Sequence, residues 1–407
     1  MDFDFKFTAE DEEFRKEVRK WLEENVPDID WPTDPYDITD EMRIIRDDLK
    51  AKLGAKGWYA PDWPKEWGGG GMPDERVAIL RQEYNRFDKG GLLGFVYAPY
   101  VTPLLEFGPE ELAKELVPPL LRGESSWWLV ETEPEHGTDN AAMESLAVLE
   151  GDHYIANGQK IYVGNNTPID PYDVWGFTPM VLKPGAPRHE NLGVFAMPLR
   201  LPGITLEKME LIGSEDVKYR LFMKDVPIPA KYLIGGPEAR GWDVLQASLR
   251  SEHGGGGNVV PPVPLVAKVI KYCKEHYRNG KPISSDPDVQ KILVDLWIEA
   301  KKEYMYTLAT YWTSKTGKWQ GVGYRAVQMI LHQKQHSPKL ARAILEILGP
   351  YAVSTDPELL VLRREVERAE RMGCVTHIAG TPEAYKIMMS RATGMTVPKG
   401  QESKRAR

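Results

Sequence analysis

The middle of this sequence changes from a helical pattern to a strand-like pattern and then back, and this succession constrains the fold most strongly. Between residues 127 and 241, short apolar runs alternate with turn residues, as at 147–149, 181–182 and 193–197, which is typical of β-strands. On either side, apolar residues recur at helical spacing. These residues are Phe14, Val18, Trp21 and Leu22 before the strands, and Ile292, Leu293, Leu296, Trp297 and Ala300 after them.

The sequence therefore predicts an α+β protein with several domains. We expect an N-terminal helical domain at residues 1–126, a middle β-domain of short strands at 127–241, and a C-terminal helical bundle at 242–407. Residues 57–69, GWYAPDWPKEWGG, interrupt the first helical region with proline and glycine. This segment is expected to be a packed aromatic loop.

Composition narrows the class of protein. Charged residues make up 28% of the chain and hydrophobic residues 42%, as in globular proteins that dissolve in water. The net charge of −8 argues against a nucleic-acid partner. The two cysteines offer neither a disulfide framework nor a metal cluster. The start lacks the pattern of a signal peptide, and no apolar stretch is as long as a membrane span, so we expect a cytoplasmic protein without a membrane partner.

Two segments of the strand-rich region carry the most specific signal. Residues 131–139 read ETEPEHGTD, and residues 157–165 read NGQKIYVGN. In this order and spacing they resemble the two flavin-binding signatures of the acyl-CoA dehydrogenase family, T-E-P-x-x-G-S-D and N-G-x-K-x-W-I-T-N. The resemblance covers nearly the whole chain and includes the aromatic loop at 57–69. Its architecture also matches the predicted helical, strand and helical succession.

The resemblance implies an activity and a cofactor. Members of the family bind FAD and oxidise acyl-CoA thioesters. A carboxylate removes the α-proton, and the β-hydrogen leaves as hydride to flavin N5. The electrons usually pass on to an electron-transfer flavoprotein. The same activity is expected of this chain.

The family pattern also implies which residues contact FAD. Thr132, Gly137 and Thr138 belong to the first signature, where Thr138 replaces the commoner serine but keeps the hydroxyl. Thr381 and Glu383 are implied contacts from the C-terminal segment. Glycine at position 137 would allow the flavin to approach the backbone closely.

The second signature departs from the family at two positions. Tyr162 replaces the tryptophan that packs on the isoalloxazine, and an aromatic ring is retained. Gly164 replaces the serine or threonine whose hydroxyl approaches flavin N5. The redox potential of the flavin or its affinity is therefore expected to differ.

The family places its catalytic glutamate at one of two positions. In the C-terminal segment THIAGTPEAY, residues 376–385, Ala379 stands at the first of these positions and cannot accept a proton. The segment LRSEH, residues 249–253, resembles the L-x-x-E-R pattern of the second position, with Glu252 on the glutamate. Glu252 is therefore the predicted base, and Glu131, where the family usually has an apolar residue, is a more distant candidate. The alternative is that Glu252 is a solvated helix carboxylate beside Arg250.

The acyl group is constrained less. A base at position 252 is compatible with branched, cyclic or bulky acyl groups. Tyr97 and Tyr100 fall where the family lines its acyl pocket, although both could be core residues. Glu131 is a possible substrate contact, and Arg250 is a cation that could meet a dicarboxylate.

Three FAD elements that the family shares between subunits look altered. They are the segment HYRNGKPI at 276–283, Glu346 in place of a glutamine, and Tyr385 in place of another. The chain is therefore expected to be a homotetramer with an adjusted FAD pose, or half of a heterotetramer with a homologue. A third alternative is a non-redox relative that only binds acyl-CoA.

Overall fold

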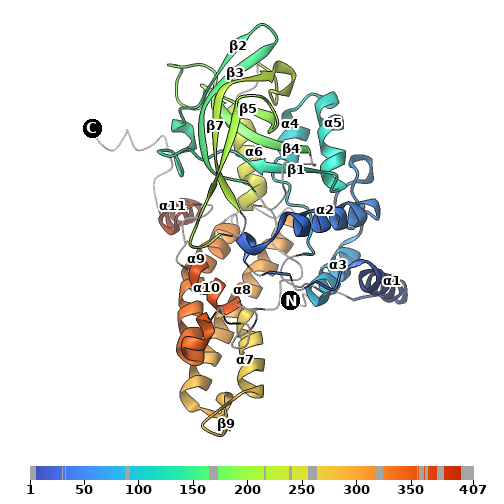
Figure 1. The fold of residues 1–407 in the computed structure, drawn as a ribbon, viewed down its shortest axis with the longest axis vertical. Coiled ribbons are helices and arrows are strands. Elements are labelled where there is room, and N and C mark those ends of the chain that lie inside the picture. Colours follow the sequence, from blue (N-terminus) through green and yellow to red (C-terminus); the bar gives the residue numbers. More distant parts are fainter. Residues whose placement is uncertain are drawn as a thin grey trace, which may run out of the picture. The chain divides into compact units, whose positions relative to one another are not determined.

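The computed structural model comprises two compact units, residues 1–252 and 253–407, which are described separately below (Figure 1). The domain boundaries expected at residues 126 and 241 stay predictions. The structure describes residues 6–29, 31–32, 34–87, 92–164, 173–214, 217–237, 241–254, 264–316, 324–354, 356, 362, 365–373 and 380–395.

The first unit begins with helices. They are α1 (Ala9–Asn25), α2 (Asp40–Ala55), α3 (Asp74–Phe87), α4 (Val101–Phe107) and α5 (Glu110–Leu121), with short 3-10 turns at Pro35–Asp37 and Lys65–Trp67. Helix α6 (Gly241–Gly254) follows the strands and carries residue 252 in its last turn.

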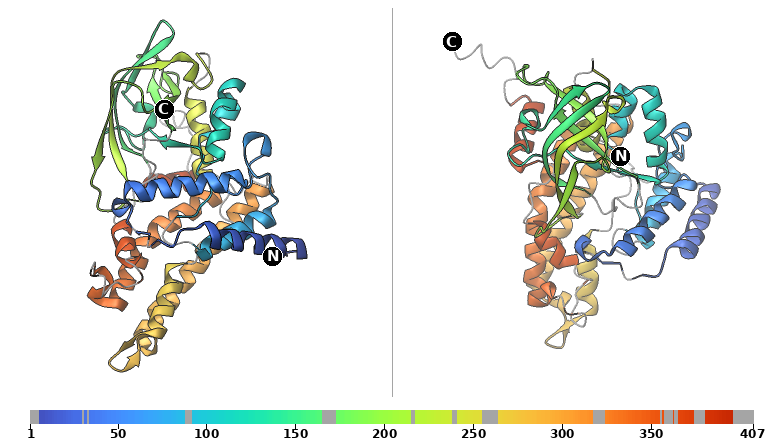
Figure 2. Two further views of the ribbon diagram at one scale, coloured as in Figure 1. Left: turned by 45° about the vertical axis from the view of Figure 1, so that its right-hand side comes forward. Right: turned by 45° about the horizontal axis from the view of Figure 1, so that its top comes forward.

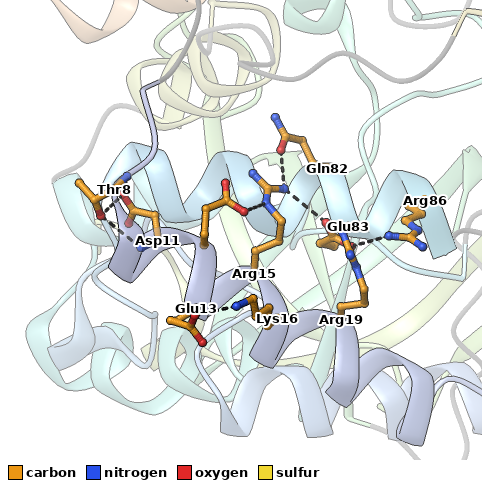
Figure 3. Close-up of polar contacts among 10 residues, drawn as sticks. Thr8, Asp11, Glu13, Arg15, Lys16, Arg19, Gln82, Glu83 and Arg86 are labelled. Atoms are coloured by element: carbon orange, nitrogen blue, oxygen red, sulfur yellow. Dashed lines mark hydrogen bonds and ion pairs between the residues drawn. The ribbon is translucent and has the colours of Figure 1, made fainter.

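Helix α1 shows how these helices are fixed. A capping box starts it, because the Thr8 side chain accepts a hydrogen bond from the Asp11 amide and Asp11 bonds back to the Thr8 amide. Figure 3 shows the ion pairs that join α1 to α3. Arg15 Nη1 lies 3.3 Å from Glu83 Oε1, and Arg19 donates to both oxygens of the same carboxylate at 3.0 Å.

Seven strands form the sheet of this unit. They are β1 (Ser125–Leu129), β2 (Leu146–Glu150), β3 (His153–Val163), β4 (Asp173–Val181), β5 (Leu192–Pro198), β6 (Ile204–Met209) and β7 (Lys218–Pro229). The strand order is β1-β4-β2-β3-β7-β6, and β5 lies off this path and pairs with Trp175–Val181 of β4. Strand β4 runs parallel to β1 and β2, and the remaining pairs are antiparallel.

Both faces of this sheet carry buried residues. Successive residues of a strand point to opposite faces, and accordingly Trp127 and Trp128 of β1 lie in two different hydrophobic clusters. The cluster around Trp127 includes residues of α4, α5 and α6, so these helices cover one face of the sheet (Figure 2). The predicted aromatic loop is confirmed as a packing element. Trp58 is buried in the core formed with α1, α2 and α3, whereas Trp63 and Trp67 pack against the cluster around Trp127.

The second unit is helical. It contains α7 (Leu265–Glu275), α8 (Pro287–Lys315), α9 (Tyr324–Leu348), α10 (Glu365–Gly373) and α11 (Pro382–Ala392), with a small hairpin of β8 (Tyr277–Arg278) and β9 (Lys281–Pro282). The predicted stripe on α8 is mostly confirmed, because Leu293 and Leu296 are buried in the core of this unit. Trp297 departs from the stripe and is 36% exposed. The predicted helical, strand and helical succession is thus confirmed. None of the helices within the described residues has the length and apolarity needed to cross a bilayer.

Candidate active site

The two signature segments lie side by side in the first unit. Thr132 follows β1, Ile161 belongs to β3, and the Ile161 amide donates to the Thr132 carbonyl at 2.8 Å. The strand-rich region therefore places segments that are 29 residues apart next to one another.

A buried ion pair fixes this contact. Lys160 is 0% exposed, and its ammonium group lies 2.9 Å from Glu133 Oε1, 3.2 Å from the Glu131 carbonyl and 2.8 Å from the Pro179 carbonyl. The Glu133 carboxylate also accepts the amides of Glu144 and Ser145, at 2.5 and 3.0 Å. Burial alone would raise the pKa of Glu133, but Lys160 and these hydrogen bonds outweigh it and lower that pKa. Both members of the pair lie in the recognised signatures, yet the sequence analysis assigned neither of them a role.

The predicted flavin contacts of the first signature form an open surface. Gly137 and Thr138 are exposed, and a Cβ at Gly137 would meet no atom within 4 Å. Packing within the chain therefore does not require glycine here, whereas close approach of a ligand to the backbone would. Thr132 is partly exposed and anchors the segment through its carbonyl.

Tyr162 and Gly164 owe their positions to a bulge in β3. The register against β7 shifts between Lys160 and Val163, and Tyr162 adopts φ 56° within that irregularity. The bulge turns Tyr162 outward and leaves it 51% exposed. Gly164 has φ 115°, and a Cβ there would lie 2.9 Å from the Tyr219 ring and 3.0 Å from the Val217 carbonyl. The missing hydroxyl at position 164 is thus a consequence of the backbone path.

These residues fit a flavin. They provide an exposed aromatic ring, an exposed threonine and an unobstructed glycine, held together by the hydrogen bond from Ile161 to Thr132. Thr132, Gly137, Thr138 and Tyr162 would hold the cofactor.

Glu252 lies among groups that the sequence analysis named separately. The Tyr97 hydroxyl donates a hydrogen bond to the Glu252 carboxylate, and Glu131 and Tyr100 lie close to that hydroxyl. Although Tyr97 is 57% exposed as a whole, burial of its hydroxyl and then the charge of Glu252 raise its pKa well above the ordinary value. The structure therefore brings the predicted base and two predicted substrate contacts together within the first unit.

Glu131 is the most perturbed acid of this group. Burial is the main cause, the charge of Glu252 adds to it, and together they raise the pKa of Glu131 to about 8, with Lys160 opposing. Its Oε1 atom is buried and has no hydrogen-bond partner within the part of the chain that the structure describes.

Tyr100 and Arg250 differ from this cluster in their surroundings. Tyr100 is 2% exposed and stacks on Trp127, and its hydroxyl lies 2.9 Å from the Tyr97 carbonyl and 3.2 Å from the Trp127 carbonyl. This arrangement makes it a buried support under Tyr97. Arg250 pairs with Glu106 at 3.2 Å, and residues 250 and 252 point in different directions because each residue turns the helix by about 100°. The proposed substrate roles of Tyr100 and Arg250 stay predictions.

The remaining predicted contacts lie in the second unit. Thr381 caps α11 by accepting the Ala384 amide at 3.1 Å. Glu383 is exposed in the first turn of α11 and pairs with Lys386 at 3.5 Å. Ala379 and the glycines from 255 to 257 lie outside the described residues. Glu346 is exposed, whereas Tyr385 is buried.

The class of protein follows from the fold and the adjoining signatures: the succession of helices, a mixed sheet and helices again, with an outward aromatic ring on the second signature, is that of a flavin-dependent dehydrogenase. Comparison with known proteins agrees. The family descriptions "Acyl-CoA dehydrogenase, N-terminal domain" and "Acyl-CoA dehydrogenase, C-terminal domain" match residues 8–124 and 239–392. The chain belongs to the acyl-CoA dehydrogenase family, whose members are FAD-dependent oxidoreductases.

Individual relatives are distant but cover most of the chain. Acyl-CoA dehydrogenase IpdE1 of Mycobacterium tuberculosis is 26% identical over 312 residues, which cover 74% of this chain and 77% of the relative. The solved ChsE4–ChsE5 complex from the same species superposes with a TM-score of 0.77 at 20% identity, covering 98% of this chain and 100% of its own. A structure described as the Tcur3481–Tcur3483 steroid ACAD has a TM-score of 0.76 at 22% identity and covers 98% and 100%.

Proposed function

We propose that this acyl-CoA dehydrogenase removes the α-proton of an acyl-CoA thioester with Glu252 and forms the α,β-unsaturated product. The observation that carries the proposal is the clustering of Glu252 with Tyr97 and Glu131 in the same unit as the flavin-facing surface. Bound FAD would supply the redox chemistry by accepting the β-hydrogen as hydride at N5. An electron-transfer flavoprotein is the proposed electron acceptor.

The residues around Glu252 and those of the two signature segments have separate proposed tasks. Glu252 accepts the α-proton, and the hydrogen bond from Tyr97 fixes the orientation of its carboxylate. Tyr100 holds the backbone of Tyr97 in place, because its hydroxyl donates a hydrogen bond to the Tyr97 carbonyl. Lys160 and Glu133 hold the signature segments together, so that Thr132 and Tyr162 keep a constant spacing. The outward ring of Tyr162 would pack on the isoalloxazine.

The proposed acyl group is branched, cyclic or otherwise bulky. Tyr97 is 57% exposed, so its ring can form an aromatic wall for such a group. A dicarboxylate is a less suitable candidate, because Arg250 already pairs with Glu106 and the cluster around Glu252 is acidic.

Flavin reduction tests the function directly. The purified chain should show a visible flavin spectrum that bleaches when a suitable acyl-CoA is added. A panel of linear, branched, cyclic and steroid side-chain thioesters would define the acyl group, and we expect the bulky members to react faster. No bleaching with any member of the panel would overturn the proposed reaction.

Replacing the base gives the largest expected effect on catalysis. Glu252→Gln should slow flavin reduction by about 10²–10⁴-fold, which is the usual range for a lost general base, while flavin content stays unchanged. Glu150→Gln is the matched control, because Glu150 is an exposed carboxylate at the end of β2. A variant at position 252 that bleaches at the wild-type rate would reject Glu252 as the base.

A second candidate is a heterotetramer in which a homologous chain completes the FAD site. The specific observation in favour is an exposed apolar stripe on α8 formed by Val294, Trp297, Ile298, Tyr304 and Met305. Such stripes mark surfaces that bind other proteins. The altered FAD elements at Glu346 and Tyr385 add a reason for a partner.

Co-expression separates the two assemblies. The chain produced alone and the chain produced with a homologue from the same genome should be compared for mass in solution and for flavin content. A flavin-containing homotetramer would reject the heteromer, whereas a colourless chain that gains flavin only with the homologue would support it.

A further inference from the structure

Glu131 is a partly buried acid for which the proposed reaction has no use. Its Oε1 atom is inaccessible and lacks a hydrogen-bond partner among the residues that the structure describes. An ionised carboxylate in that position is costly, because burial removes the water that would stabilise its charge. A neutral carboxyl group avoids most of this cost.

The neighbouring cation does not solve the problem. An ammonium group has three hydrogens to donate. Those of Lys160 have three acceptors in the Glu131 carbonyl, the Glu133 carboxylate and the Pro179 carbonyl. The charge of Lys160 is already balanced by Glu133, which is itself buried. Lys160 of β3 therefore attracts the carboxyl group of Glu131 through its charge alone.

The groups on the other elements do not stabilise a charge on Glu131 either. From α6 it faces the carboxylate of Glu252, which repels a second negative charge. From the segment before α4 it faces the Tyr97 hydroxyl, whose single hydrogen is donated to Glu252. Among the described neighbours, like charge and occupied donors thus surround the Glu131 carboxyl.

We propose that Glu131 is a positioning residue for the base, a neutral acid that leaves the single negative charge of the pair on Glu252. This inference rests on the proposed function, because that function assigns the role of base to Glu252. The pKa of Glu131 agrees, since burial and then the charge of Glu252 raise it to about 8. At neutral pH Glu131 therefore keeps its proton.

Raising the pH through about 8 charges Glu131 and places another carboxylate beside the base. Activity should therefore show an inflection near pH 8 that belongs to Glu131.

The test compares the wild-type holoenzyme with Glu131→Gln, which is neutral at every pH and nearly the same shape. In kcat/KM against pH, we expect the two profiles to coincide well below pH 8, because residue 131 is neutral there in both proteins. The inflection near pH 8 should be present in the wild type and absent in Glu131→Gln. Glu131→Leu, which is also uncharged, should reproduce this loss, and Glu150→Gln should retain the wild-type profile.

Infrared spectroscopy provides a readout that is independent of turnover. Raising the pH through about 8 should convert one carboxyl C=O band to a carboxylate band in the wild type and in Glu150→Gln, but not in Glu131→Gln. A Glu131→Gln profile that already departs from the wild type well below pH 8 would overturn the inference, since it would mean that Glu131 is charged at neutral pH. Absence of the titrating band would also overturn it.

The two hypotheses fail differently. If no acyl-CoA reduces the wild-type flavin, the proposed function is wrong, and the role of Glu131 toward a base is wrong with it. If reduction occurs and the pH profiles of wild type and Glu131→Gln coincide, only the inference about Glu131 is wrong.

Discussion

The contact between α1 and α3 and the cluster of Glu131, Tyr97 and Glu252 each shield a carboxyl group from water, and they treat it in opposite ways. Glu83 receives hydrogen bonds from Arg19 and Arg15, so its pKa is lowered even though burial acts to raise it. Glu131 receives no such donor from the described residues, and its pKa is raised to about 8. Burial alone therefore does not decide the charge of a carboxyl group; the donors around it do.

Glu133 and Glu131 show the same contrast within one segment of the chain. It lies two residues from Glu131, it is 4% exposed, and it remains charged because Lys160 and two backbone amides stabilise it. The first signature thus contains one charged acid, Glu133, that supports the structure, and one acid, Glu131, whose surroundings favour the protonated form. The difference can be tested by removing donors and acids one at a time.

Removing Lys160 should have the largest effect. Lys160→Met leaves the Glu133 carboxylate buried without its cation, and breaking a buried pair costs about 3–5 kcal/mol of unfolding free energy. Urea denaturation of the full chain would measure the loss. Lys183→Met, at an exposed lysine, is the control and should change the free energy by less than about 0.5 kcal/mol. The double variant Lys160→Met/Glu133→Gln should recover part of the loss; no recovery would show that an unpaired Glu133 is not the cause.

Replacing Glu131 should stabilise the folded protein, whereas replacing Lys160 should destabilise it. Because its pKa in the folded protein is raised from 4.5 to about 8, the stability of the wild type is complete below the unfolded pKa and is lost as the pH rises toward 8. Glu131→Gln removes this dependence and should therefore be more stable than the wild type near pH 8. Thermal unfolding at about pH 5 and about pH 8 measures the difference, which should be small at the lower pH. Equal stability at both pH values would contradict a protonated Glu131.

Replacing Glu83 should have the smallest effect of the three. Glu83→Gln removes the charge that Arg15 and Arg19 contact but keeps one acceptor oxygen, so we expect a loss of about 1.5 kcal/mol, the lower end of the range for one hydrogen bond to a charged group. Since the pKa of Glu83 is lowered, its contribution is present above the unfolded pKa and is lost as the pH falls. The wild type and the variant should therefore differ at neutral pH and converge in acid, as measured by urea denaturation. A difference that grows in acid would refute the ion-pair account.

Much of the fold could be predicted because it depends on local patterns. The 3.6-residue spacing of Phe14, Val18 and Leu22 places them in the buried stripe of α1, as observed. The short apolar runs at 147–149 and 193–197 lie in β2 and β5. The hairpin at 277–282 was missed, although Asn279-Gly280 is a strong turn signal and both residues have positive φ.

The site was predictable only in part. Motif spacing identified Glu252, Tyr97 and Glu131 as candidates, but their proximity depends on how α6 and the segment before α4 lie against the sheet. The bulge that turns Tyr162 outward depends on the register of β3 against β7, which the residue pattern of one strand does not encode. The role of Lys160 required knowledge of which acceptors surround it.

Gly164 has a practical consequence for anyone who would engineer this enzyme. A single exchange to serine would not restore the hydroxyl of the related enzymes, because the new side chain would meet the Tyr219 ring at 2.9 Å and the backbone has φ 115°. Tyr219 cannot yield easily, since it stacks on the buried Trp128 with ring centres 5.5 Å apart. A redesign would have to change the path of the strand and its aromatic support together, so this departure from the family is difficult to reverse.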